Sequence, residues 1–149
     1  MKILALDIAT KTGWAMCDDG KYGYGVFVCE CEIRGAKYDM FMVKLLKLFK
    51  SFNSYKPDII VFEKAFQKSQ KSTELYHGFL AMLEYRAWQY GIDLMGVYAT
   101  HLKKWATGNG KASKERMIAA AKLLGWDPKD DNEADALLLL EYALETIKK

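Results

Sequence analysis

The sequence has few of the residues that build disulfide frameworks, thiolate metal sites or membrane spans. Its three cysteines, Cys17, Cys29 and Cys31, form no CxxC pair and stand at no zinc-ligand spacing from either histidine. We interpret them as reduced residues that fill space rather than as ligands. No apolar run approaches the roughly 18 residues of a membrane span, and no cleavable leader pattern follows Met1. These absences predict a cytoplasmic protein with no membrane partner.

Interdomain linkers, internal repeats and low-complexity tracts are absent as well. The 149 residues are 51% hydrophobic and 13% aromatic, which is enough for one sizeable core. We therefore expect a single domain over residues 1–149. The net charge of +3 neither requires nor excludes a polyanionic partner, but the charges are unevenly distributed. Basic residues gather within 101–116, and acidic residues gather within 127–135.

The hydrophobic pattern predicts one α/β domain with a five-stranded mixed sheet. The run at 58–62 is continuously apolar, which is typical of a strand buried on both faces. Ser72 or Thr73 is the expected cap of the second helix. Strands are expected over 2–9, 13–17, 22–31, 58–62 and 94–97, and helices over 37–52, 72–90, 112–124 and from the turn at 126–130 to the C-terminus.

Two acidic residues stand at the ends of two expected strands. Asp7 lies near the end of the first strand, and Glu63 directly follows the buried strand. If these strands are neighbours, the two carboxylates share one rim of the sheet. Each would raise the pKa of the other unless a cation lay between them. The alternative is that Asp7 caps a turn and Glu63 is a solvated strand end.

A third group of acids precedes the last apolar helix, in the stretch DDNEADALLLL. On a helix, Asp135 lies about 60° from Asn132 and about 40° from Asp131 around the axis, whereas Glu133 lies about 160° away. Asp135 is therefore expected to face the sheet and Glu133 to face solvent. Alanines on either side of Asp135 allow the helix to pack closely. The alternative is an ordinary helix N-terminus whose acids favour the positive end of the dipole.

Such a cluster of oxygen ligands, without histidine or cysteine, suits a hard divalent cation. Magnesium is preferred, and manganese can take its place. Two such ions about 4 Å apart can activate a water and stabilise the leaving oxygen in phosphodiester hydrolysis. The sequence therefore predicts a metal-dependent phosphodiesterase site at this rim.

Four segments, in this order, resemble the RuvC family of Holliday-junction resolvases, in particular its short bacteriophage forms. They are ILALDIATKTGWA, KPDIIVFEKAF, LKKWATGNGKASKERM and NEADAL, and together they extend over nearly the whole chain. The resemblance implies a ribonuclease H-like fold, with helices on both faces of the mixed sheet. Cellular members commonly have a proline directly after the first aspartate. This chain has Ile8, which favours a phage or prophage form acting in the cytoplasm of a bacterial host.

The resemblance also implies the ligands of the metal site. Asp7, Glu63 and Asp135 match the family's metal-binding carboxylates, and its fourth ligand falls on Asn132. Family members usually have an acid or histidine at that fourth position. Helix geometry also leaves Asp131 as a candidate there.

The family's DNA contacts fall on two further segments. Phe66 matches the aromatic that wedges near the branch point, where it can stack on an unpaired base, although a plain core phenylalanine is the alternative. Lys103 and Lys114 match lysines that contact the backbone near the scissile phosphate, and two glycines would let the main chain approach DNA. A solvated loop is the alternative for this stretch. The expected DNA-binding residues are Phe66, Lys103, Lys104, Gly108, Gly110, Lys111 and Lys114.

The function implied is magnesium-dependent resolution of four-way DNA junctions by paired hydrolysis. Because a four-way junction has approximate two-fold symmetry, a homodimer is also implied. Another nuclease specificity on the same fold, for branched DNA or RNA–DNA hybrids, and a non-catalytic DNA-binding module are the alternatives. Actin-like phosphotransferases are disfavoured because the chain has no second Asp-Gly-rich phosphate loop. The second helix offers a dimer interface or an ordinary core face through Phe79, Met82, Leu83 and Trp88.

Overall fold

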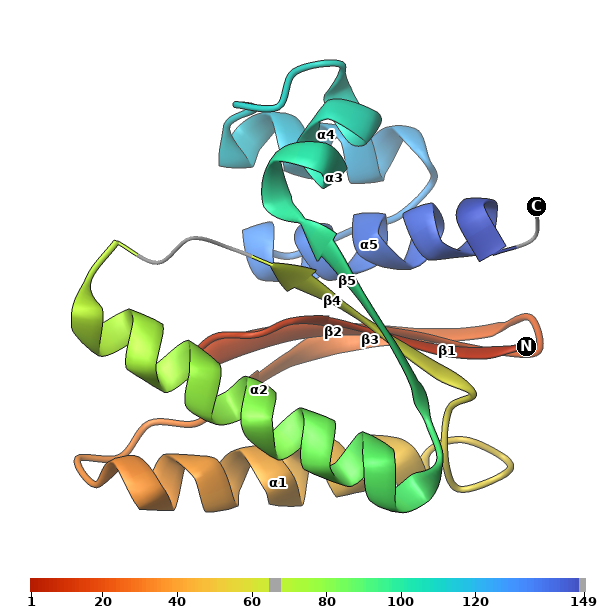
Figure 1. Ribbon diagram of the computed structural model, residues 1–149. Coiled ribbons are helices and arrows are strands. Elements are labelled where there is room, and N and C mark those ends of the chain that lie inside the picture. The colour runs from red at the N-terminus through yellow and green to blue at the C-terminus, as the bar shows by residue number, and fades with distance from the viewer. Residues whose placement is uncertain (65–67, 148–149) are drawn as a thin grey trace.

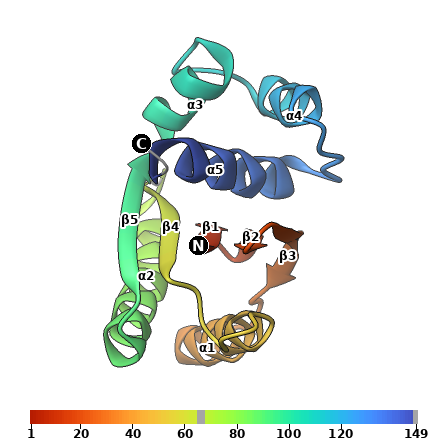
Figure 2. The same ribbon diagram turned by 90° about the vertical axis from the view of Figure 1, so that its right-hand side faces the viewer.

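The computed structural model describes residues 1–64 and 68–147. Its helices lie in layers on both sides of one sheet (Figures 1 and 2). The described strands are β1 (Lys2–Asp7), β2 (Lys11–Asp18), β3 (Lys21–Val28), β4 (Ile59–Lys64) and β5 (Asp93–Tyr98). The described helices are α1 (Arg34–Lys50), α2 (Gln70–Tyr90), α3 (Ala99–Thr107), α4 (Lys114–Leu123) and α5 (Asp131–Ile147).

The sheet is mixed, as the sequence predicts, with the strand order β3-β2-β1-β4-β5. Strands β1, β2 and β3 form an antiparallel meander, whereas β4 and β5 extend it in parallel with β1. The turn between β1 and β2 is held by Thr12, whose hydroxyl donates to the carbonyl of Ala9 at 2.6 Å. Strand β4 is central and buried on both faces, which explains its unbroken apolar run.

Strand alternation divides the core into two parts. Leu4 and Leu6 of β1 point to one face, where α1 and α2 cover the sheet. Ile3 and Ala5 point to the other face, where α5 lies across the strands and α3 and α4 lie outside α5 (Figure 2). Because side chains alternate along a strand, Asp7 belongs to the face that α5 covers.

Small residues let α5 lie close against the sheet. Ala134 and Ala136 of α5 are both fully buried. The first turn of α5 lies very close to Gly13 on β2. A Cβ atom at Gly13 would lie 2.0 Å from the carbonyl oxygen of Asn132. A side chain at Gly13 is therefore incompatible with the present position of the first turn of α5.

Helix α2 begins earlier than predicted. Its cap is Ser69 rather than Ser72 or Thr73, because Ser69 and Ser72 form a reciprocal capping box. The Ser69 hydroxyl oxygen accepts from the backbone N–H of Ser72 at 3.2 Å, and the Ser72 hydroxyl oxygen accepts from the backbone N–H of Ser69 at 3.3 Å. Ser72 thus contributes as the third helical residue and not as the cap.

Helix α3 was not predicted at all. The sequence pattern treats the stretch after β5 as a basic loop, but Ala99–Thr107 is helical and follows β5 directly. Its N-cap, Tyr98, makes no side-chain capping hydrogen bond, so no helix-start signal precedes it. Lys103 and Lys104 therefore stand on a helix rather than on a loop.

The predicted core face of α2 is confirmed for part of its residues, and Met82 packs against the same core while partly buried. The alternative of a dimer interface stays a prediction. Phe79 and Leu83 are fully buried in the core beside α1, so the core interpretation is right for both. Trp88 instead is 77% exposed and lies against Tyr85 on the outer side of the helix. Among the residues that the structure describes, no helix has the length and apolar character needed to cross a membrane.

Candidate active site

Asp7 and Glu63 lie at adjacent strand ends, as predicted. The parallel register of β1 and β4 pairs Leu6 with Phe62, so the two acids are the next residue on each strand. Glu63 shares the alternation of Val61, whose side chain packs on the α5 side. Both carboxylates therefore belong to the face that α5 covers.

Asp135, near the start of α5, lies close enough to these acids for the charges to interact. Burial, and after it the charges of Glu63 and Asp135, raise the pKa of Asp7 well above its usual value. Burial also raises the pKa of Glu63. Burial, and then the charges of Glu63 and Asp131, raise the pKa of Asp135 to about 7. Mutual repulsion of this kind is what a bound cation would relieve.

The unpaired oxygen atoms of the cluster fit a hard cation. Glu63 Oε2 and Asp135 Oδ1 are buried and have no hydrogen-bond partner among residues 1–64 and 68–147. Buried carboxylate oxygens are normally paired, and unpaired ones indicate a functional site or an ion. Within residues 1–64 and 68–147, no three acidic, histidine or cysteine side chains converge tightly enough to hold a metal ion. The ligand set therefore remains a prediction, supported by the chemistry of its donors.

One prediction for the first turn of α5 is wrong. Glu133 does not face solvent but is only 6% exposed. Its carboxylate accepts from the backbone N–H of Lys129 at 2.8 Å, and its own N–H donates to Asp130 Oδ1 at 2.9 Å. The turn before α5 folds back over the helix and buries this side chain. Glu133 is thus part of the helix cap.

The two remaining candidates on this turn have different surroundings. Asp131 forms an ion pair with Lys114 at 3.3 Å. Asn132 lines a hollow together with Ile8 and Thr10, which follow Asp7 in the chain. Asp131 also lies near the cluster, because its charge raises the pKa of both Asp7 and Asp135. The two candidates thus differ in that Asp131 is paired with a lysine and Asn132 is not in an ion pair within the described residues.

Two of the predicted DNA-binding lysines lie beside the acids. The positive charge of Lys103 lowers the pKa of both Glu63 and Asp135, opposing the effect of burial. Lys114, at the start of α4, also lowers the pKa of Asp135. Helix α3 and the start of α4 thus bring cations to the edge of the carboxylate cluster.

The other predicted DNA-binding residues are farther along this segment. Lys104 and Lys111 are exposed. Gly108 ends α3 with φ of +80°, and its N–H donates to the carbonyl of Lys104 at 2.8 Å, so the turn itself requires a glycine. A Cβ atom at Gly110 would lie 3.2 Å from the carbonyl oxygen of Thr100. The structure explains both glycines locally, and their contact with DNA remains a prediction.

Two residues show the limits of the sequence prediction. Phe66 lies outside the described residues. Tyr76 on α2 was not predicted, yet its buried hydroxyl donates to the carbonyl of Glu63 at 2.8 Å. No sequence signal marks it, because a tyrosine at this spacing is typical of a helix core face.

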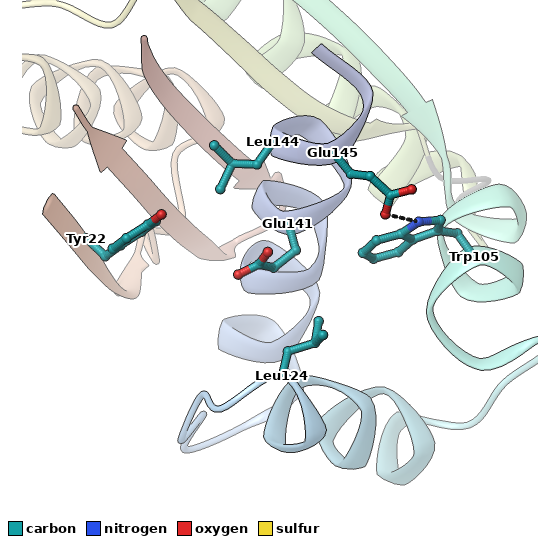
Figure 3. A pocket seen from close by; sticks show the side chains of 6 residues that line it. All are labelled: Tyr22, Trp105, Leu124, Glu141, Leu144 and Glu145. Carbon is teal, nitrogen blue, oxygen red and sulfur yellow. Dashed lines mark hydrogen bonds between the residues drawn. The ribbon is translucent and has the colours of Figure 1, made fainter. Parts of the chain in front are cut away.

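Another hollow lies on the outer side of α5, between β3 and the helices α3 and α4 (Figure 3). Its carboxylates already have donors: the indole N–H of Trp105 donates to Glu145 at 3.2 Å, and that of Trp126 donates to Glu141 at 2.9 Å. These contacts attach α3 and the turn after α4 to α5. The hollow therefore differs from the rim, where carboxylate oxygens lack partners.

The raised pKa of Asp135 predicts a pH-dependent cost in stability. A carboxyl with a pKa of about 7 when folded and an ordinary value of 3.8 binds its proton more tightly in the folded chain. The stabilisation of the folded chain by this tighter proton binding is complete at low pH and is lost as the pH rises to about 7. In EDTA, the free energy of unfolding should therefore fall less between low pH and about pH 7 in Asp135→Asn than in the wild type. The expected difference is about 2 kcal/mol, which allows for partial solvent exposure of the carboxyl.

Urea denaturation between about pH 4 and about pH 8 measures this difference. Asp39→Asn, an exposed change on α1, is the control and should leave the pH profile unchanged. An Asp135→Asn variant whose free energy of unfolding falls with pH as steeply as that of the wild type would contradict the predicted pKa.

A mixed five-stranded sheet with acids at the ends of β1 and β4, and a third acid on the covering helix, is the arrangement expected for the ribonuclease H-like fold. No protein-family model matches the sequence. The crossover junction endodeoxyribonuclease RuvC of Corynebacterium diphtheriae is 30% identical over 139 residues, covering 87% of this chain and 85% of that protein. The chain belongs to the RuvC family of crossover junction endodeoxyribonucleases, which confirms the resemblance to the family. Its assignment to a phage or prophage form stays a prediction.

Further relatives agree with this assignment. RuvC of Corynebacterium jeikeium is 30% identical over 139 residues, again with 87% and 85% coverage. The structure of T. thermophilus RuvC in complex with Holliday junction substrate matches with a TM-score of 0.77 at 18% identity, covering 93% of this chain and 90% of that chain. A complex of Fowlpox virus resolvase with Holliday junction DNA matches with a TM-score of 0.58 at 14% identity over all of both chains. These likenesses confirm the predicted fold.

Proposed function

We propose that this protein is a magnesium-dependent endonuclease that resolves four-way DNA junctions by paired phosphodiester hydrolysis. The observation that carries the proposal is the position of Asp7, Glu63 and Asp135 on one rim beside Lys103. The proposal fits the family assignment and the Holliday-junction complexes of T. thermophilus RuvC and Fowlpox virus resolvase. Paired cleavage of a two-fold symmetric substrate requires two matched sites, so the acting form is a homodimer.

The acidic residues would hold magnesium, or manganese in its place. Asp7 and Glu63 supply carboxylates from the sheet, and Asp135 supplies one from α5. When bound, the metal provides the Lewis acidity that activates water and stabilises the leaving oxygen. The buried, unpaired oxygens of Glu63 and Asp135 are suited to this role because no donor in the described part of the chain competes for them.

Asn132 is the preferred fourth ligand. Asp131 is already paired with Lys114, whereas Asn132 lies beside the residues that follow Asp7. An amide oxygen coordinates magnesium without adding negative charge. The site is therefore less charged than one with a fourth acid, and it should bind metal more weakly than such a site.

The lysines beside the acids should contact the DNA backbone. Lys103→Ala should lower junction cleavage about tenfold or more, and it should reduce the slope of the salt dependence of binding by about one unit. Lys114→Ala should have the same effect on the slope. Lys122, an exposed lysine in the last turn of α4, provides the matched control. Unchanged slopes and rates for both Lys103→Ala and Lys114→Ala would contradict the proposed DNA-facing surface.

A substrate panel tests the function itself. The panel contains four-way junctions, three-way forks, flaps, linear duplex and RNA–DNA hybrid, each incubated with and without magnesium. Paired nicks confined to four-way junctions are the expected result. Equal cleavage of forks and flaps would indicate a broader branched-DNA nuclease, cleavage of the hybrid would indicate a ribonuclease, and binding without cleavage would indicate a non-catalytic module.

A further inference from the structure

The hydrogen bond between α2 and the end of β4 has a consequence for the active site. Tyr76 lies in the second turn of α2 and is 6% exposed. Its hydroxyl donates to the carbonyl oxygen of Glu63 at 2.8 Å, and this contact is buried. It joins two residues separated by 13 positions, across the end of the strand and the start of the helix.

The Tyr76 contact lies on a part of β4 that is paired on one side. The β1–β4 register ends at Leu6 and Phe62, one residue before Glu63, whereas β4 stays paired with β5 at Glu63 and Val97. Among the described residues, the Glu63 Oε2 atom has no hydrogen-bond partner. The Tyr76 hydroxyl therefore adds a restraint to the Glu63 main chain where pairing with β1 has ended.

The phenol is suited to a permanent donor role. Burial, and after it the charges of Glu63 and Asp7, raise the pKa of Tyr76 to about 12. Tyr76 also lines the hollow that contains Ile8 and Asn132. Asn132 is one of the proposed ligands, and Ile8 directly follows another, Asp7.

We propose that Tyr76 is a positioning residue that sets the metal affinity of the site by fixing the backbone of Glu63. This proposal rests on the proposed function, because it takes Glu63 as a metal ligand. If the Glu63 backbone were free to shift, its carboxylate would be held less precisely for metal binding, because ligand geometry depends on the groups that orient each ligand. Tyr76 itself need not touch metal or DNA.

Titration of the metal-free protein with Mn²⁺ alone tests the proposal independently of cleavage. Tyr76→Phe keeps the ring and removes only the hydroxyl, and it should weaken Mn²⁺ binding about three- to tenfold. Tyr38→Phe is the matched control: Tyr38 packs against Phe79 in the same core, and its hydroxyl makes no hydrogen bond within the described part of the chain. It should bind Mn²⁺ as the wild type does.

Cleavage of a four-way junction provides the second readout. Tyr76→Phe should need about three- to tenfold more Mg²⁺ for half-maximal rate, with unchanged junction affinity and with the rate restored at saturating Mg²⁺. A merely structural defect would not be rescued by metal. Thermal unfolding in EDTA verifies that both variants are folded.

The possible outcomes separate the two proposals. Unchanged Mn²⁺ affinity in Tyr76→Phe, or an equal loss in Tyr38→Phe, would overturn the positioning role. A wild type that binds Mn²⁺ but cleaves no substrate would contradict the proposed function, while the Mn²⁺ titration would still decide the role of Tyr76. A wild type with no measurable Mn²⁺ binding would overturn both.

Discussion

Asp7→Asn, Glu63→Gln and Asp135→Asn should each lower junction cleavage by at least about 100-fold while leaving junction binding nearly intact. The three carboxylates lie at one rim, so each change removes a proposed metal ligand without altering the lysines proposed to contact the DNA backbone. Nicking assays measure the loss, and gel shifts in Ca²⁺ measure binding. Neutralising one acid also reduces repulsion toward the DNA, so binding can become slightly tighter.

Asp39→Asn is the charge-matched control, because Asp39 is an exposed acid on α1 that is remote from the rim. It should cleave at the wild-type rate. A variant of Asp7, Glu63 or Asp135 that cleaves as fast as Asp39→Asn would not have lost a ligand, and that residue would be removed from the proposed site.

Gly13→Ala should destabilise the protein by about 3 kcal/mol and also impair cleavage. The added Cβ would lie 2.0 Å from the carbonyl oxygen of Asn132, and neither group can move without its backbone. The first turn of α5 must therefore retreat from the sheet, and it takes Asp135 away from Asp7. Urea denaturation measures the first effect, and junction nicking measures the second.

Gly35 is the matched control for this change. A Cβ atom at Gly35, in the first turn of α1, would meet no atom within 4 Å. Gly35→Ala should therefore be neutral or slightly stabilising. If Gly13→Ala unfolds at the same urea concentration as the wild type, the close contact between α5 and β2 is not required for stability.

The sequence predicts the sheet side of the site better than the helical side. Asp7 and Glu63 could be placed together because each ends an apolar run, and parallel strands carry their ends to one edge. Glu133 was misplaced because a helical projection considers the helix alone. The preceding turn, which folds back and buries Glu133 through Lys129, is a tertiary contact that such a projection does not contain.

The missed features share a physical cause. Helix α3 has no capping side chain and no breaker before it, so nothing local separates it from β5. Tyr76 has the spacing of a core residue, and its bond to Glu63 depends on how α2 crosses the sheet. Trp88 follows the same apolar pattern as Phe79, yet only the latter lies against α1. Periodicity identifies an apolar face but does not say how much of that face is covered.

Because β5 passes directly into α3, we expect the strand and the helix to move together as one rigid unit. Tyr98 ends the strand and Ala99 begins the helix, so no loop residue is present to absorb a rotation between them. Any twist of this outer strand must carry Lys103 with it, and a force on Lys103 must be transmitted into the sheet.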